Sequence, residues 1–370
     1  MTTERADLSG RAGRVLARLA DAEALLVTDL TNIRWITGFT GSNGWVVLGP
    51  GGLVLVTDGR YGEQAAQQMA AAGVAGEVRV GATGAATLQH VADACAAYAT
   101  VGFEAAHVTV LQHTQYLAII ASRLVATTGV VEAERRVKDG AEIDAMARAC
   151  RIADQALAEV VPMLGEGVTE AQVRNRLELR MRELGASGPS YDTIVATGPH
   201  HASLPHHRPT DTLIEPGHTV IIDVGALVDG YHGDMTRTFF VGEPTAQQRE
   251  LYEVVLTAQQ AGVAAVKAGL SVKELDGVCR GIIADAGYGD WFTHGTGHGV
   301  GLLIHEDPFV NRAGDAILQV GDVVTVEPGV YREGFGGIRV EDLVVVTSDG
   351  CRVLTESPKD FTCPPFPPTT

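Results

Sequence analysis

Two stretches indicate the fold of this chain of 370 residues: GHTVIIDVG, residues 217–225, and GDVVTVEPG, residues 321–329. They align without a gap at an offset of 104 residues. A second pair of segments, GVTEAQ at 167–172 and GLSVKE at 269–274, aligns at an offset of 102 residues. Two matches at nearly the same offset predict a duplicated unit, in which a helix is followed by a hairpin. Asp223 and Glu327 then occupy equivalent positions of the two copies.

Both copies carry the sequence signature of a helix start. Thr169 with Gln172, and Ser271 with Glu274, fit a capping box, in which a hydroxyl accepts from the backbone amide three residues on and that residue's side chain reaches back. We expect each helix to end at a glycine, the first at Gly185.

In the first copy, the hairpin sequence predicts which side chains face each other. The β-branched run Thr219–Ile222 suits a buried strand that ends at Asp223, and Asp229-Gly230 is a two-residue turn signal. Counting back from that turn, Asp223 faces Thr236 and Asp234 faces Gly225. Because side chains two apart share a face, both aspartates lie on one face. Two carboxylates so close need a cation, a shared proton or open solvent.

The second copy repeats this pattern. A strand over residues 323–326 leads to Glu327, and a Gly-rich loop reverses the chain. We expect residues 338–346 to return as one strand that carries Glu341, with Arg339 on the same face.

Between the copies, HGTGHGVG at 294–301 brings His298 beside glycines that permit close approach of a ligand. Four carboxylates and one imidazole favour hard or borderline divalent ions, and such a set can bridge two of them. Two adjacent ions can hold a shared water as hydroxide near neutral pH. The competing interpretations are turn-forming or solvated acids, or a phosphate-binding loop, although no lysine follows as a P-loop requires.

Four segments together resemble the metal-site blocks of the methionyl aminopeptidase/creatinase group: DVGALVDGYHGDMTRTF, HGTGHGVGLLIHEDP, VEPGVY and GIRVEDL. The resemblance implies an α+β protein with a duplicated "pita-bread" catalytic domain over residues 136–370. It implies two divalent metal ions, manganese before cobalt or zinc. The ligands that it implies are Asp223, Asp234, His298, Glu327 and Glu341.

Within this group the chain resembles aminopeptidase P and prolidase, which implies hydrolysis of Xaa-Pro peptides by the metal-held hydroxide, with Glu327 as general base. LPH at 204–206 resembles the segment that brings a histidine, His206, to the substrate, and IHEDP resembles the segment of a second one, His305. Arg339 resembles an arginine that orients a bridging carboxylate, and we expect Tyr331 to support it. Four histidines share one loop, at positions 200, 201, 206 and 207, of which one or two are expected to matter.

Phe309 marks a departure from strict prolidases, which often carry an arginine just after the HExP stretch. Without that cation, the free carboxylate of a dipeptide lacks a charge-assisted partner. We therefore predict aminopeptidase P activity, with strict prolidase as the alternative, since another loop could supply an arginine. Two competing hypotheses are a metal-free creatinase-like hydrolase and a non-catalytic binding module. Both predict the loss of ligands, yet all five are present.

The first third of the chain predicts a separate domain. A helical pattern covers residues 11–20, strand patterns cover 24–28, 45–48, 53–57 and 125–132, and a long amphipathic helix follows over 143–160. TNIRWITGFTG at 31–41 and TDGRY at 57–61 resemble the small creatinase-like domain of these enzymes. We expect an α/β N-terminal domain over residues 1–135.

The composition excludes several partners. The formal charge of −17, with no run of Lys or Arg, argues against nucleic acids and anionic membranes. No secretory signal or apolar span is expected, and five scattered cysteines without a CxxC pair indicate reduced thiols. We expect a cytoplasmic protein that takes proline-containing peptides and, as the resemblance implies, forms a homodimer. The Pro-rich end, CPPFPPTT, is expected to be irregular.

Overall fold

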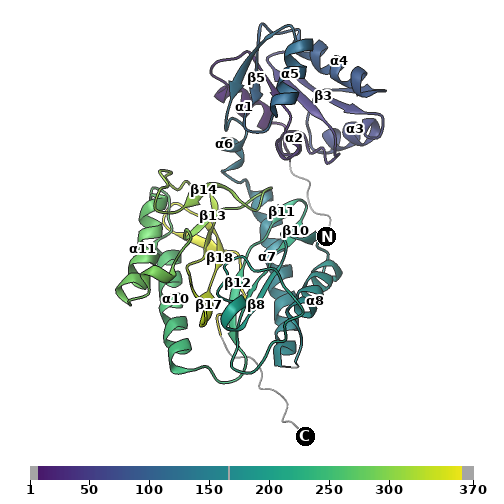
Figure 1. The fold of residues 1–370 in the computed structure, drawn as a ribbon. Coiled ribbons are helices and arrows are strands. Elements are labelled where there is room, and N and C mark those ends of the chain that lie inside the picture. Colours follow the sequence, from purple (N-terminus) through teal and green to yellow (C-terminus); the bar gives the residue numbers. More distant parts are fainter. Residues whose placement is uncertain (1–6, 166, 361–370) are drawn as a thin grey trace. The chain divides into compact units, whose positions relative to one another are not determined.

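A computed structural model describes residues 7–165 and 167–360, so the Pro-rich end lies outside the described residues. The chain divides into two compact units, residues 1–135 and 136–370 (Figure 1). Each unit has its own sheets and helices, and each is described separately below.

Unit 1 is built on a six-stranded mixed sheet with the order β4-β3-β2-β1-β5-β6. Its strands are β1 (Ala24–Val27), β2 (Trp45–Gly49), β3 (Gly52–Asp58), β4 (Glu77–Gly81), β5 (Thr100–Glu104) and β6 (Arg123–Thr127). Its helices are α1 (Arg11–Arg18), α2 (Leu30–Thr37), α3 (Gly62–Ala71), α4 (Gly84–Cys95), α5 (Val110–Ile119) and α6 (Glu132–Arg135). The predicted α/β N-terminal domain is confirmed in fold class.

One predicted strand of unit 1 is misplaced. The apolar pattern over residues 125–132 predicted a strand, but β6 ends at Thr127 and Glu132 already begins α6. Gly129, with φ of 68°, turns the chain between the two elements. Such a positive φ is readily adopted only by glycine, so the strand pattern could not continue through it.

Unit 2 consists of two half-units in which helices cover strands. Its helices are α7 (Gly140–Val160), η1 (Val161–Gly165), α8 (Glu170–Glu183), α9 (Gly198–His201), α10 (Ala246–Ala265), α11 (Val272–Asp285) and η2 (Gly289–Trp291). Its first strands are β7 (Gly188–Pro189), β8 (Ile194–Thr197), β9 (Thr219–Asp223), β10 (Ala226–Val228), β11 (Tyr231–His232) and β12 (Thr236–Phe240). The later strands are β13 (Gly297–Gly299), β14 (Glu306–Val310), β15 (Val323–Val326), β16 (Gly329–Arg332), β17 (Gly336–Arg339), β18 (Asp342–Val346) and β19 (Cys351–Val353).

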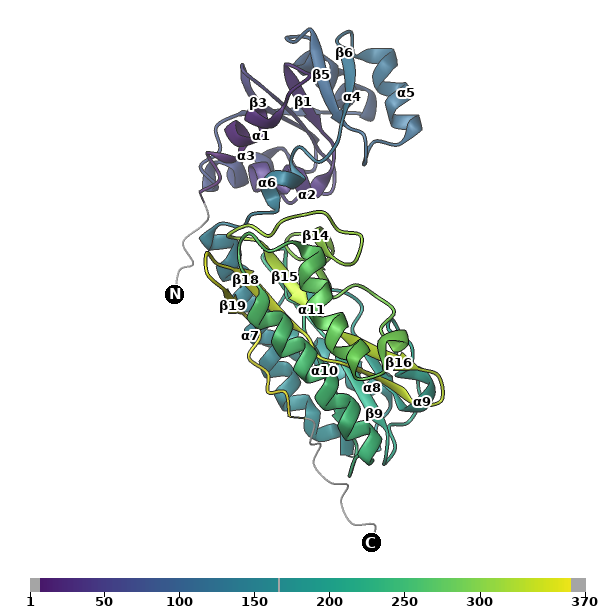
Figure 2. The same ribbon diagram turned by 90° about the vertical axis from the view of Figure 1, so that its left-hand side faces the viewer.

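The strands of unit 2 lie between two pairs of helices. Apolar side chains of α7 and α8 pack on the sheet β12-β9-β8. Those of α10 and α11, which run side by side, pack on β15 and β18 of the sheet β14-β13-β15-β18-β19 (Figure 2). Strands thus form the middle layer and helices the outer layers, which confirms the predicted pita-bread fold (Figure 1).

The duplication is visible in the backbone. Both capping boxes, at Thr169 and Ser271, are present as predicted. Thr169 forms an isolated bridge with Leu213, and Ser271 forms one with Ile317. The two helix starts are therefore tied to the chain in the same way, one in each half-unit.

The predicted hairpin register of the first half-unit is also confirmed. Asp229 and Gly230 have φ values of 50° and 78°, as a two-residue hairpin turn requires. Val228 pairs with Tyr231, and Asp223 pairs with Thr236.

The returning strand of the second half-unit is interrupted, unlike the prediction. Residues 338–346 belong to two strands, because β17 ends at Arg339 and β18 begins at Asp342. At the interruption, the amide of Glu341 donates to the carbonyl oxygen of Thr236 at 3.1 Å. Glu341 is therefore linked through its backbone to the other half-unit.

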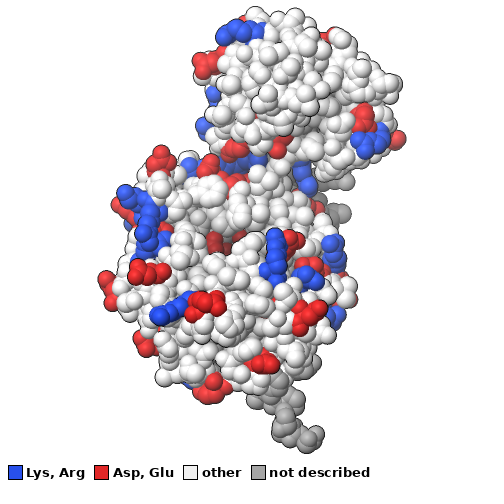
Figure 3. All heavy atoms as spheres, in the orientation of Figure 1, with Lys and Arg blue, Asp and Glu red and all other residues white. Residues whose placement is uncertain are grey.

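Within the described residues, no helix is both long enough and apolar enough to span a membrane. On the face drawn in Figure 3, Lys and Arg side chains are interspersed with Asp and Glu, and acidic atoms lie in a hollow of unit 2.

Candidate metal centre

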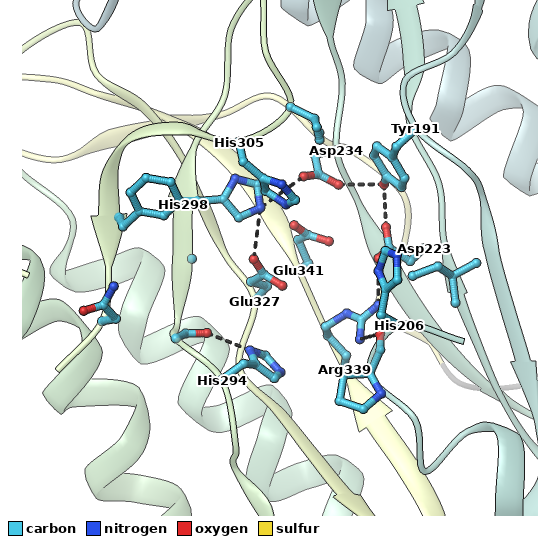
Figure 4. Close-up of a pocket in the computed structure, with 17 residues that line it drawn as sticks. Tyr191, His206, Asp223, Asp234, His294, His298, His305, Glu327, Arg339 and Glu341 are labelled. Atoms are coloured by element: carbon cyan, nitrogen blue, oxygen red, sulfur yellow. Dashed lines mark hydrogen bonds and ion pairs between the residues drawn. The ribbon is translucent and has the colours of Figure 1, made fainter. Parts of the chain in front are cut away.

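Unit 2 contains a cavity of about 620 Å³ between the two half-units (Figure 4). All eight residues predicted from the sequence to act in catalysis or metal binding line this cavity. They are His206, Asp223, Asp234, His298, His305, Glu327, Arg339 and Glu341.

Three carboxylates converge in the cavity. Oxygen atoms of Asp223, at the end of β9, of Asp234, which follows β11, and of Glu341 lie within 4.8 Å of one another. Asp234 and Glu341 are only 5% and 2% exposed. Burial and the carboxylate of Asp223 raise the pKa of Asp234 well above its ordinary value. Burial and the carboxylate of Asp234 do the same to the pKa of Glu341.

His298 and Glu327 form an ion pair beside these acids. Nε2 of His298 lies 3.3 Å from Glu327 and 3.6 Å from Asp234. Burial alone would raise the pKa of Glu327, but the hydrogen bond to His298 and the charge of that imidazole lower it to about 2. Burial lowers the pKa of His298, yet the bond to Glu327 outweighs it and raises the pKa overall. Glu327 is therefore ionised in the neutral pH range.

Arg339 connects the acids to the rest of unit 2. Its guanidinium donates to Asp223 at 2.7 Å, to the hydroxyl of Thr236 at 3.0 Å and to that of Tyr331 at 2.6 Å. The hydroxyl of Thr236 in turn donates to Glu341 at 2.7 Å. The arginine is thus placed to orient Asp223 directly and Glu341 through Thr236, and its contact with Tyr331 agrees with the supporting role expected there.

Tyr191 belongs to the cavity and was not predicted. Its hydroxyl bonds to Asp223 and lies 2.6 Å from Oδ1 of Asp234 (Figure 4). Burial and the neighbouring carboxylates raise its pKa well above the ordinary value. Because a neutral phenol has one proton, it can donate to only one of the two acids at a time. No motif marks Tyr191, which lies in the loop between β7 and β8.

Three more histidines surround the acids. His206 and His305 are exposed to the cavity, and the ring of His305 packs edge-on against His298 at 4.4 Å. Burial and the charge of His298 lower the pKa of His305. His294 accompanied His298 in the glycine-rich motif, but the sequence assigned it no role. It contacts the hydroxyl of Tyr331 at 3.0 Å, and burial lowers its pKa.

The four histidines that share one loop differ in their surroundings. Of these four, only His206 lines the cavity. His200 bonds to Glu333, whereas His201 and His207 bond to Glu170 at the start of α8.

The donor set suits divalent cations. Three carboxylates lie close together in a largely buried pocket, with one imidazole and a fourth carboxylate adjacent. Acidic groups buried so close together favour a bound cation over separate charges. Oxygen-rich ligands with one nitrogen suit hard or borderline divalent cations.

Comparisons with known proteins agree with this geometry. Residues 144–348 match the model of metallopeptidase family M24, and residues 11–137 match the creatinase/prolidase N-terminal domain. The chain is 41% identical over 342 residues to the uncharacterized peptidase YqhT of Bacillus subtilis, covering 92% of this chain and 95% of that protein.

Two solved structures are similar over nearly their whole length. An Xaa-Pro dipeptidase from Bacillus anthracis is 38% identical with a TM-score of 0.90, covering 95% of this chain and 98% of that one. The X-Pro aminopeptidase from Thermotoga maritima MSB8 is 34% identical with a TM-score of 0.85, covering 93% and 98%. The chain therefore belongs to metallopeptidase family M24 and carries the N-terminal domain of the creatinases and prolidases.

Proposed function

We propose that this metallopeptidase releases the first residue of peptides that carry proline in second place, and that it acts on peptides longer than two residues. The observation that supports the first part is the cavity, in which buried carboxylates and two exposed histidines converge. Relatives named Xaa-Pro dipeptidase and X-Pro aminopeptidase support the same substrate class.

We propose that two divalent cations are held by Asp223, Asp234, His298, Glu327 and Glu341. Bound there, they would lower the pKa of a water molecule towards neutrality and polarise the scissile carbonyl. Manganese is the first candidate, followed by cobalt or zinc.

Glu327, one of these ligands, and the side chains around them supply the proton transfers. Glu327 accepts a proton from the attacking water and passes it to the proline nitrogen. That nitrogen carries no hydrogen in the peptide, so it must receive a proton before it can leave. His206 and His305 donate to the carbonyl oxygen as negative charge develops on it. Arg339 holds Asp223 in place at 2.7 Å.

The preference for longer peptides depends on what the cavity offers to a carboxylate. Among the described residues that line it, Arg339 is the one arginine or lysine, and it is 2% exposed and already paired with Asp223. Phe309, 45% exposed, occupies the wall at the position after Pro308. The free carboxylate of an Xaa-Pro dipeptide would therefore meet an aromatic ring, whereas a longer peptide carries an amide there.

The test is hydrolysis of an Xaa-Pro dipeptide and an Xaa-Pro-Yaa tripeptide, side by side, with manganese and after chelation. We expect faster cleavage of the tripeptide, lost on chelation and restored by metal. Cleavage of the dipeptide alone would identify an Xaa-Pro dipeptidase instead, the function favoured by the similarity to the Bacillus anthracis protein. No cleavage of either peptide by the metal-loaded protein would refute the Xaa-Pro substrate class.

A further inference from the structure

A second group of charged side chains lies outside the cavity, around the carboxylate of Glu170. Glu170 is fully buried, and five polar groups lie within hydrogen-bonding distance of its two oxygens. Oε1 accepts from the amide of Thr197 at 2.8 Å and lies 3.0 Å from Nδ1 of His201. Oε2 accepts from the amide and hydroxyl of Thr210 at 2.9 and 3.0 Å, and lies 2.9 Å from Nε2 of His207.

These partners enclose one loop. Thr197 is the last residue of β8, and Thr210 lies 13 positions later, so Glu170 holds both ends of the segment that carries His206. His201 and His207 add two further attachments inside it. His206 takes part in none of these bonds, and its side chain points into the cavity (Figure 4).

The other half-unit shows that the fold does not require a carboxylate at this position. Glu170 follows the helix cap Thr169, and Val272 follows the equivalent cap Ser271. Their amides make equivalent bonds, to the carbonyl oxygens of Thr212 and Ala316 at 3.1 and 3.0 Å. Val272 is buried in the apolar core of its half-unit. A buried carboxylate thus takes the place of an apolar side chain only in the half-unit that carries the histidine loop.

The group is a poor metal site, although one carboxylate and two imidazoles are close enough to suggest one. The rings of His201 and His207 are stacked, with centroids 4.2 Å apart and planes 22° apart. Imidazole lone pairs lie in the ring plane, so two nearly parallel rings direct them side by side and not at one ion. Each ring instead meets its own oxygen of Glu170.

The part of the loop next to His206 is attached to Arg339 at the candidate metal centre. Nη1 of Arg339 donates to the carbonyl oxygen of Pro205 at 3.2 Å, and the same guanidinium binds Asp223. The peptide group before His206 is thus fixed from the cavity side by Arg339, while Glu170 fixes the base of the loop.

We propose that Glu170, together with His201 and His207, is a positioning group that sets the place of His206 relative to the metal centre. The inference rests on the proposed function, in which His206 contacts the substrate. Its physical basis is that a displacement of about 1 Å of a catalytic group can lower turnover about 100-fold. In Glu170→Gln, the side-chain NH2 group would replace one of the two carboxylate oxygens. The N–H and O–H groups of the loop that donate to that oxygen would then lose their acceptor.

The test is a double-mutant cycle of Glu170→Gln and His206→Ala, measured as kcat and KM for an Xaa-Pro-Yaa peptide. We expect Glu170→Gln alone to lower kcat about 10- to 100-fold, with KM and bound metal nearly unchanged. In the His206→Ala background, the same change should lower kcat less than about 2-fold, because the positioned group is already absent. Equal effects in both backgrounds, or none in the wild type, would overturn the proposal.

Hydrogen exchange provides a readout that does not depend on activity. Glu170→Gln should accelerate exchange of the amides in residues 198–210 and leave those of β9 and β15 unchanged. Faster exchange throughout unit 2 would indicate a merely structural role and overturn the proposal. Glu274→Gln, at the exposed cap of the other half-unit, is the matched control and should change neither turnover nor loop exchange.

Two more outcomes distinguish the positioning role from the proposed function and from a metal site. If the wild type cleaves no Xaa-Pro peptide, the proposed function fails, and loop exchange alone still decides whether Glu170 holds the loop. Zinc titration of the wild type and of His207→Ala tests whether the group binds metal. If His207→Ala binds one equivalent of zinc fewer than the wild type, the group is a metal site and the positioning role is overturned.

Discussion

Replacement of Arg339 by methionine should destabilise unit 2 strongly, and less so when metal is present. Methionine retains much of the aliphatic packing but removes four side-chain hydrogen bonds, to Asp223, Thr236, Tyr331 and Pro205. The bond to Asp223 belongs to a buried ion pair, with side chains 3% and 15% exposed. Removing one partner of such a pair costs about 3–5 kcal/mol, because the other charge stays buried without compensation.

The dependence on metal follows from the same charge. A divalent cation next to Asp223 would supply the positive charge that the guanidinium supplied, so the loss of unfolding free energy should be smaller in manganese than in chelator. Hydrogen exchange of the β9 and β12 amides measures this free energy for unit 2 alone. Denaturant unfolding of a chain with two units would mix two transitions.

Arg332→Met is the matched control. Arg332 lies in the hairpin β16–β17 that also carries Arg339, but it is exposed and stacks over Trp291 at 4.8 Å. Its replacement should cost less than about 1 kcal/mol. If Arg339→Met lowers the free energy of unfolding by no more than Arg332→Met does, in chelator and in manganese alike, then the guanidinium does not compensate the charge of Asp223. That result would refute the reasoning.

Four other predictions can be tested with the same preparations. Asp223→Ala should abolish binding of at least one metal ion and turnover; an active variant with full metal content would contradict its role as a ligand. His206→Ala should lower kcat about 10- to 1000-fold, and an unchanged kcat would show that it does not touch the reacting carbonyl. Phe309→Arg should raise the ratio of kcat/KM for an Xaa-Pro dipeptide to kcat/KM for a tripeptide about 10-fold, because a charge-assisted hydrogen bond to the dipeptide carboxylate contributes about 1.5–3 kcal/mol. An unchanged ratio would show that the side chain at position 309 does not contact that carboxylate. Because the pKa values of Asp234 and Glu341 are raised, these acids keep protons that a metal ion must displace. Metal affinity should therefore rise with pH, and metal binding should release protons, which calorimetry in two buffers can measure. A metal affinity that does not depend on pH would argue against both acids as ligands.

The sequence predicted the parts of the site that depend on local rules. Asp229-Gly230 determined a turn, the turn determined the register, and the register brought Asp223 and Asp234 together. Capping boxes and glycines located the helix starts of both half-units.

The parts that it missed depend on contacts between distant segments. Tyr191 reaches both aspartates from a loop without a motif, and nothing in its neighbours distinguishes it from a packing residue. Glu170 lies in a capping-box sequence, so its pattern is fully explained by a helix start until the loop of residues 198–210 folds against it. The interruption of the strand at Glu341 arises because that residue pairs with Thr236, 105 positions earlier.

The link between Arg339 and Asp223 also has a consequence during synthesis of the chain. The two residues are 116 positions apart, and at roughly 5–20 residues per second the arginine is made on the order of 10 s after the aspartate. For that interval the nascent first half-unit displays its acids without their guanidinium or the ligands of the second. Metal capture by the full set of proposed ligands would therefore be one of the last events in the maturation of unit 2, and a bound ion would report that both half-units have closed on each other.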